Sequence, residues 1–180
     1  MSKSLVFISD LHIGTSSELG FSESGVNIRD QDKIDRARLV SDYCKENKIF
    51  GVVISGDIYE SANPKTSHRK IAAKIIRLLS KVCPVLIIPG NHDYGRDGCS
   101  LTEGLYDIDN VKIILEPEII EFSGRDLICI PHMIKGKIGF EKAFKEMEKA
   151  YAGKNAILLC HVSALGAVSS TGFEMRGAEE

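Results

Sequence analysis

The sequence has no long apolar run. No stretch approaches the roughly 20 apolar residues that a membrane-spanning helix requires, so the sequence predicts no membrane span. The first residues contain only the short apolar run from Leu5 to Ile8 before Asp10, and we therefore expect no secretory signal.

Clustered cysteines and an excess of one charge are also absent. The five cysteines never form a Cys-x-x-Cys pair, which is typical of reduced thiols that fill core space in a cytoplasmic protein. The 23 basic and 25 acidic residues leave a net charge of −2, so a whole-surface electrostatic grip on nucleic acid is not expected, although a local basic face remains open. The remaining composition, 43% hydrophobic and 27% charged, argues against disordered, collagen-like and coiled-coil classes and predicts one domain over residues 1–180.

Short β-branched runs alternate with helical patterns in the first half of the chain. Apolar runs at 5–8, 50–54 and 85–88 lack strict alternation, which is typical of strands that are covered on both faces. Between them, residues 32–47 and 66–81 carry apolar side chains at three-and-four spacing and are predicted to be helices. This order of elements predicts parallel strands joined by crossovers.

The second half of the chain shows a different pattern. Links with Pro117 and Gly124 suit tight turns, so an antiparallel meander is expected there. A lysine-rich helix from about Phe140 to Tyr151 then precedes one more strand. The expected strands of this half are residues 111–115, 118–122, 126–130 and 156–160.

Polar side chains stand just beyond the carboxyl ends of the predicted strands. Because these ends meet in one crevice of a parallel sheet, we expect the side chains to converge. Carboxylate, imidazole and amide oxygen ligands suit a divalent ion such as Mn²⁺, Zn²⁺ or Fe²⁺. Two ions about 3.5–4 Å apart can share one carboxylate, and Asp57 is the expected bridge. The full set is Asp10, His12, Asp57, Asn91, His92 and His161.

The motifs that carry these residues resemble the calcineurin-like metallophosphoesterase superfamily. The motifs are Asp10-x-His12, Gly56-Asp57, Gly90-Asn91-His92-Asp93 and the later strand-end His161. Each is weak alone, whereas all four in order are specific. The stretches DLHIG, ISGDIYESANP, PVLIIPGNHD and ILLCHVSALGA are most similar to the SbcD-type nuclease subunit of double-strand-break repair.

This resemblance implies a fold, an activity and partners. The implied fold is α/β, a four-layer α/β/β/α sandwich that here lacks its C-terminal strands. The implied activity is that of a hydrolase, a manganese-dependent DNA nuclease acting on DNA ends in repair or recombination, with Zn, Fe or Mg as alternative ions. The implied partners are DNA, an SbcC-type ATPase subunit and, in the full-length protein, a second copy of the chain.

The resemblance also implies a role for each motif residue. His92 would point at the scissile phosphate, where it protonates the leaving oxygen or stabilises developing charge. Asp93 would orient His92 and support its charge. The implied metal ligands are Asp10, His12 and Asp57 for one ion, and Asp57, Asn91 and His161 for the other.

The sequence departs from the superfamily pattern at two places. A Gly-His-x-His motif is expected beyond His161, but no histidine follows it in these 180 residues, so we expect the chain to be the N-terminal part of a longer protein. Glu60 stands where nuclease relatives are expected to carry Asp or His, which would weaken a contact to phosphate or to His92. Two alternatives stay open: a phosphomonoesterase or small-substrate phosphodiesterase of the same superfamily, and a catalytically incomplete binding or assembly module.

Three further residues are interpreted as structural. His132 is expected to cap a strand exit, and His68, in the first turn of the second helix, is expected to face solvent. Gly14 is expected to let the chain turn sharply beneath the metal site.

Overall fold

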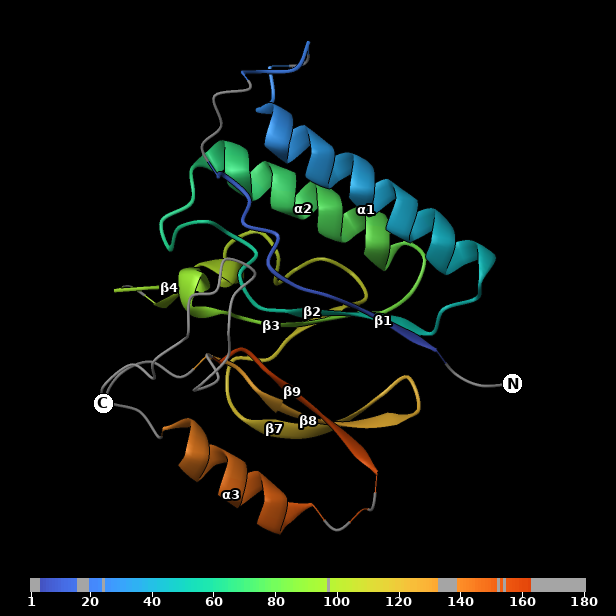
Figure 1. Cartoon of the computed structure of the whole chain (residues 1–180), viewed down its shortest axis with the longest axis vertical. Coiled ribbons are helices and arrows are strands. Elements are labelled where there is room, and N and C mark those ends of the chain that lie inside the picture. The colour runs from blue at the N-terminus through green and yellow to red at the C-terminus, as the bar shows by residue number, and fades with distance from the viewer. Residues whose placement is uncertain are drawn as a thin grey trace, which may run out of the picture.

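A four-stranded parallel sheet forms the first half of the protein (Figure 1). The computed structural model describes residues 4–15, 20–23, 25–96, 98–132, 139–151, 153 and 155–162. The strand order is β1-β2-β3-β6, and every neighbouring pair is parallel. The parallel arrangement and the fully buried central run of β3 confirm the prediction from the non-alternating apolar runs. The strands are β1 (Leu5–Ile8), β2 (Gly51–Ser55), β3 (Val85–Ile88) and β6 (Val111–Ile113).

Two helices cover one face of this sheet (Figure 1). Helix α1 (Ile28–Glu46) begins four residues before the predicted range because the side chain of Asn27 caps it, accepting a hydrogen bond from the backbone N–H of Arg29. Helix α2 (Thr66–Ser80) matches its predicted range to within one residue. The apolar sides of both helices pack against the β-branched residues of β2 and β3, which makes this the largest core cluster.

A second sheet and a third helix complete four layers. Strands β7 (Glu118–Phe122) and β8 (Arg125–Ile130) are antiparallel, and β9 (Ala156–Cys160) pairs parallel to β8. One core cluster joins the two sheets, with Val53 and Leu86 on one side and Leu127 on the other. A third cluster joins β8 to helix α3 (Phe140–Ala150) through Ala143. The three clusters separate four layers, so the predicted α/β/β/α sandwich is confirmed (Figure 1).

The predicted antiparallel meander is wrong in its first strand. Val111 and Ile113 pair in parallel with Val85 and Ile87 of the first sheet instead of pairing with β7. Ile114 then enters the core between the sheets. Pro117, which has no N–H to donate to a ladder, lies in the link to the second sheet. Only β7 and β8 form the expected hairpin.

Short elements complete the described chain. A 3-10 turn, η1 (Asn91–Asp93), follows β3 and leads into the two-stranded ribbon of β4 (Tyr94–Gly95) and β5 (Gly98–Cys99), after which comes η2 (Ser100–Thr102). Among the described residues, none of the helices is both long enough and apolar enough to cross a bilayer. All five cysteines are free, and Cys44, Cys83 and Cys129 are buried, as expected for core-filling thiols.

Candidate metal centre

The six polar side chains predicted to converge come together at one rim of the molecule. Asp10 and His12 follow β1, Asp57 follows β2, and His161 follows β9. Asn91 and His92 lie in η1, directly beyond β3. Because β1, β2 and β3 are parallel, their carboxyl ends meet at this rim, and β9 of the second sheet ends beside them: the Ser55 hydroxyl donates to the Cys160 carbonyl at 3.2 Å.

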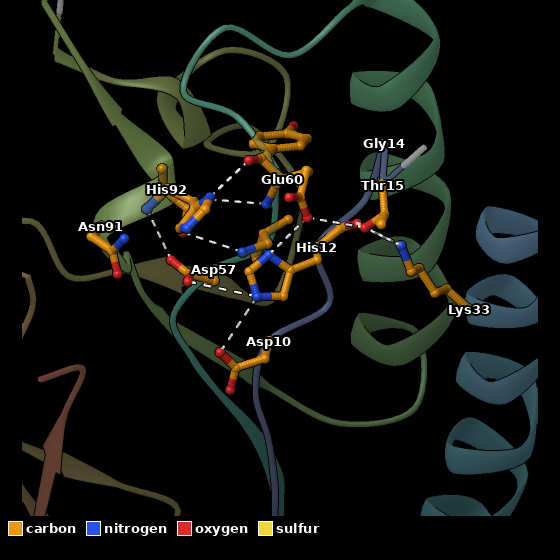
Figure 2. A network of polar contacts seen from close by, with 12 residues as sticks. Asp10, His12, Gly14, Thr15, Lys33, Asp57, Glu60, Asn91 and His92 are labelled. Carbon is orange, nitrogen blue, oxygen red and sulfur yellow. Dashed lines mark hydrogen bonds and ion pairs between the residues drawn. The ribbon is translucent and has the colours of Figure 1, made fainter. Parts of the chain in front are cut away.

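The first half of the centre consists of Asp10, His12 and Asp57 (Figure 2). The Nε2 atom of His12 lies 3.8 Å from Asp10 Oδ1 and 3.8 Å from Asp57 Oδ2. Ligand atoms of these three residues lie within 4.8 Å of one another. Two ligands bound to one ion at about 2.0–2.2 Å must themselves be roughly 3–4 Å apart. The spacing therefore fits one divalent ion.

The second half consists of Asp57, Asn91 and His161. The Nε2 atom of His161 lies 3.4 Å from Asp57 Oδ2 and 3.2 Å from Asn91 Oδ1. The same Asp57 oxygen thus faces an imidazole of each half. Its other oxygen, Oδ1, accepts a hydrogen bond from the backbone N–H of His92 at 3.0 Å. Asp57 is only 4% exposed, so both of its oxygens are committed to this centre.

Each of the three imidazoles of the centre has a protein oxygen beside its Nδ1 atom. The Nδ1 atom of His161 lies 3.1 Å from the Ser55 carbonyl, and that of His92 lies 2.7 Å from the Glu60 carbonyl. The Nδ1 atom of His12 is buried without a well-aligned hydrogen bond but lies 3.2 Å from Glu60 Oε2. An acceptor at Nδ1 places the proton there and leaves Nε2 free, which is how proteins fix the tautomer of metal-binding histidines.

The backbone at the centre is strained. Asp10, His12 and Asp57 adopt left-handed φ angles of 56°, 44° and 48°. For residues with a side chain such a conformation costs about 1–2 kcal/mol each, and it persists where the surrounding structure over-determines it. Half of the six non-glycine residues with positive φ among the described residues are therefore candidate ligands of one ion.

Two motif glycines are required by close approach. A Cβ at Gly56 would lie 2.0 Å from His161 Nδ1, and one at Gly90 would lie 2.1 Å from Asp57 Oδ1. Gly56 also has a φ of +88°, which favours glycine. The Gly-Asp and Gly-Asn-His motifs thus carry glycine because the ligands pack directly against the backbone.

Asp93 was expected to orient His92 and to support its charge, and in the structure its carboxylate binds backbone N–H groups while its charge acts on the His92 ring. The carboxylate of Asp93 is fully buried and accepts hydrogen bonds from the backbone N–H groups of Ile58, Tyr59 and Gly90, at 3.0–3.2 Å. These bonds join the loop after β2 to the loop after β3. The Nδ1 atom of His92 is contacted by the Glu60 carbonyl instead. That carbonyl raises the pKa of His92, and the charges of Asp57, Glu60 and Asp93 add to the shift.

Glu60 and Lys33 contact the centre in ways that sequence reasoning missed, and His132 lies near it. The Glu60 side chain reaches His12, whereas the sequence predicted a weakened contact to phosphate or His92. Lys33, to which the helical pattern assigned no role, reaches the His12 carbonyl from α1 (Figure 2). His132 is half-buried, and burial lowers its pKa, with nearby His161 lowering it further and Asp57 raising it. No local motif marks Lys33, because it reaches the His12 carbonyl through a contact between residues that are far apart in the sequence.

The remaining structural interpretations are partly confirmed. Gly14 has a φ of +99° and turns beneath the centre as expected. His68 is half-buried, which corrects the prediction that it faces solvent: a Cβ at Gly14 would lie 2.5 Å from its Nδ1. The ring of His68 therefore packs under the glycine of the loop that carries His12.

Comparison with known proteins places the chain among phosphoesterases. A family model described as calcineurin-like phosphoesterase matches residues 3–174. The DNA double-strand break repair protein Mre11 of Thermoplasma acidophilum is 28% identical over 157 residues, covering 82% of this chain and 42% of that protein. Its namesake from Saccharolobus solfataricus is 29% identical over 126 residues, covering 68% and 33%. This chain thus spans less than half the length of these relatives.

Solved structures show only a distant likeness. The nuclease MPE of Pseudomonas putida has 15% identity and a TM-score of 0.38, over 70% of this chain and 52% of that one. A protein of unknown function from Aquifex aeolicus has 17% identity and a TM-score of 0.36, over 83% and 73%. Likeness at this level carries no argument about function.

Proposed function

The chain belongs to the calcineurin-like phosphoesterase family, and from this premise we propose that it holds the metal centre of a DNA nuclease of the SbcD and Mre11 type. The family depends on two metal ions. We propose manganese as the ion. The two Mre11 relatives, which are named for double-strand break repair, support DNA ends as the substrate.

The observation that carries the proposal is the position of Asp57. One of its oxygens faces His12 of one half and His161 of the other, at 3.8 and 3.4 Å. A carboxylate whose oxygen faces the Nε2 atoms of two imidazoles suits a ligand shared by two cations. We propose that the ligand sets are Asp10, His12 and Asp57, and Asp57, Asn91 and His161.

The residues around these ligands supply the remaining chemistry. Two bound divalent ions would activate a water and stabilise charge on the phosphoryl oxygens. His92 lies edge-on to His12, with ring centroids 5.1 Å apart, and its Nδ1 is held by Glu60. Its raised pKa favours the protonated ring, so Nε2 can donate a proton to the departing oxygen. Asp93 keeps the loop that carries His92 in place.

The partners follow from the same relatives. We propose that residues 1–180 form the N-terminal part of a nuclease domain in a longer protein, which would supply a Gly-His-x-His motif to the same centre. That protein would act as a homodimer with an SbcC-type ATPase. The share of the relatives that this chain covers, 42% and 33%, supports the proposal that the protein is longer.

Hydrolysis assays with Mn²⁺ test the proposal. The longer protein should cleave bis-p-nitrophenyl phosphate and linear DNA, whereas His92→Gln should bind Mn²⁺ normally and lose turnover. Asn91→Ala should weaken Mn²⁺ binding, and Asn155→Ala, an exposed position at the opposite end of β9, is the matched control. Cleavage of phosphomonoesters alone would replace the nuclease by a phosphomonoesterase. Absence of any phosphoester cleavage with intact ligands would contradict the proposal.

A further inference from the structure

We propose that Lys33 of α1 is a positioning residue that holds His12 in its metal-binding geometry, with buried Asp30 holding Lys33. This inference rests on the proposed metal centre. It assigns a task to a helix that contributes no ligand to that centre. The contact crosses from the outer layer of the sandwich to the loop after β1 (Figure 2).

The ammonium group of Lys33 is fully used within the protein. It has three N–H donors and three acceptors: the His12 carbonyl at 2.5 Å, Asp30 Oδ1 at 3.1 Å and Thr15 Oγ1 at 3.5 Å. Its side chain is 20% exposed. A lysine that served only solubility would keep its head group in water. Lys33 instead directs its shortest bond at the peptide of a candidate ligand.

Asp30 fixes the direction of that ammonium. Its side chain is 2% exposed, and its Oδ1 accepts both the Lys33 ammonium and the backbone N–H of Gly14 at 3.1 Å. This carboxylate oxygen therefore joins α1 to the loop at Gly14 and also holds the Lys33 ammonium, which reaches the loop at the His12 carbonyl. The loop turns at Gly14 with positive φ, directly after the residues that it must hold.

The same network continues to the imidazole of His12. The Thr15 hydroxyl lies 2.5 Å from the His12 carbonyl and 3.0 Å from Glu60 Oε2. Glu60 Oε2 in turn lies 3.2 Å from His12 Nδ1. His12 thus accepts hydrogen bonds at its carbonyl from Lys33 and Thr15, and Glu60 Oε2 lies beside its ring.

His12 needs this support because of its backbone. Its φ of 44° lies in the left-handed region, which a residue with a side chain leaves unless contacts hold it there. Relaxation toward an ordinary φ would turn Nε2 away from Asp10 and Asp57. His161 of the second half is instead oriented by the Ser55 carbonyl at the end of β2. Loss of Lys33 should therefore affect one half of the centre and spare the other.

The variants must separate positioning from folding. Lys33→Met alone would leave the buried Asp30 charge without its partner, which is destabilising by itself. The double variant Asp30→Asn with Lys33→Met removes both charges, and the Asn amide oxygen still accepts from Gly14. Lys45→Met, at an exposed position in the last turn of the same helix, is the matched control.

The readout is Zn²⁺ binding seen separately at each ring. Zn²⁺ is diamagnetic and takes the same carboxylate and imidazole ligands. In a titration of the 180-residue chain followed by the NMR signals of the His12 and His161 rings, both rings of the wild type should saturate. In the double variant, half-saturation at His12 should require about 10–100-fold more Zn²⁺, the usual effect of removing an outer support. The Zn²⁺ concentration for half-saturation at His161 should change by less than about threefold.

Two outcomes would overturn the inference. Unchanged binding at His12 in the double variant would show that Lys33 does not position it. An equal loss at both rings, in proportion to a lower melting temperature, would show a purely structural role. If the wild type bound Zn²⁺ at neither ring, the proposed metal centre itself would be wrong, and the two failures are thus distinguishable.

Discussion

Replacing Asp57 by Asn tests whether one carboxylate serves both halves of the centre. The variant Asp57→Asn keeps the shape of the side chain, and the amide oxygen can still accept the hydrogen bond from the His92 backbone. The amide NH₂ then faces the Nε2 atoms of His12 and His161, and an unprotonated Nε2 can accept a hydrogen bond from it. Burial raises the pKa of Asp93 and the charge of Asp57 raises it further, so removing the Asp57 charge relieves a repulsion. We therefore expect the metal-free stability to change by less than about 1 kcal/mol, within the range of ordinary substitutions.

The response to Mn²⁺ should change strongly. An ion present at 100 times its dissociation constant stabilises the folded state by about 2.7 kcal/mol. For a protein of this size each kcal/mol shifts the melting temperature by roughly 2–4 °C, so one occupied ion raises it by about 5–11 °C. Thermal denaturation of wild type and variant at equal Mn²⁺ measures this directly. The exposed Asp107→Asn is the matched control and should respond like wild type.

The expected result is a Mn²⁺-dependent rise in wild type and control that is nearly absent in Asp57→Asn, because no anionic oxygen remains between the two imidazoles. A variant that kept the full Mn²⁺ response would refute the assignment of Asp57 as the shared ligand. A variant that lost only part of it would show that the two halves bind independently.

Three further outcomes follow from the packing and the charges. Gly90→Ala should lower the free energy of unfolding by about 1–3 kcal/mol and abolish Mn²⁺ binding, since a Cβ there meets Asp57. Gly139→Ala, with open space around it, should do neither. Urea denaturation with and without Mn²⁺ measures both effects. Leu86→Ala, fully buried between the sheets, should cost about 2–5 kcal/mol, and a loss below 1 kcal/mol would contradict the packing of the two sheets. Burial lowers the pKa of His68, so the unfolded state binds the proton first as the pH falls below the usual pKa of histidine. The free energy of unfolding should therefore fall as the pH drops from that usual pKa to the lowered pKa of the folded state. Urea denaturation should show a smaller fall in His68→Gln.

Local patterns in the sequence were sufficient for the regular elements and for the place of the centre. The non-alternating apolar runs indicated covered parallel strands, and three-and-four spacing indicated α1 and α2, because both signals depend on neighbouring residues. The convergence of Asp10, Asp57 and Asn91 could be predicted since parallel strands bring their carboxyl ends to one edge. The roles of these side chains as ligands stay predictions.

Contacts between distant segments could not be predicted in the same way. The strand at 111–113 joins the first sheet because Ile114 enters the core between the sheets, and a short apolar run does not specify its partner. Asp93 was expected to contact His92, but three backbone N–H groups surround its carboxylate in the folded chain. The partner of a strand and the hydrogen-bond partners of a buried carboxylate both depend on which groups are buried together.

By itself, the sequence determined the alternation of strands and helices and the motifs that end the strands, because these follow from residue type and spacing. The four-layer α/β/β/α class followed only from the resemblance that these motifs carry. Tertiary structure decided how the imidazoles are aimed. Glu60, Lys33 and Asp30 act on His12 only after α1 is laid across the sheet and the loop after β2 is brought beside the loop after β1. A hydrogen bond exists only when donor and acceptor meet within about 3 Å, and folding alone brings residues 21 or 48 positions apart to that distance.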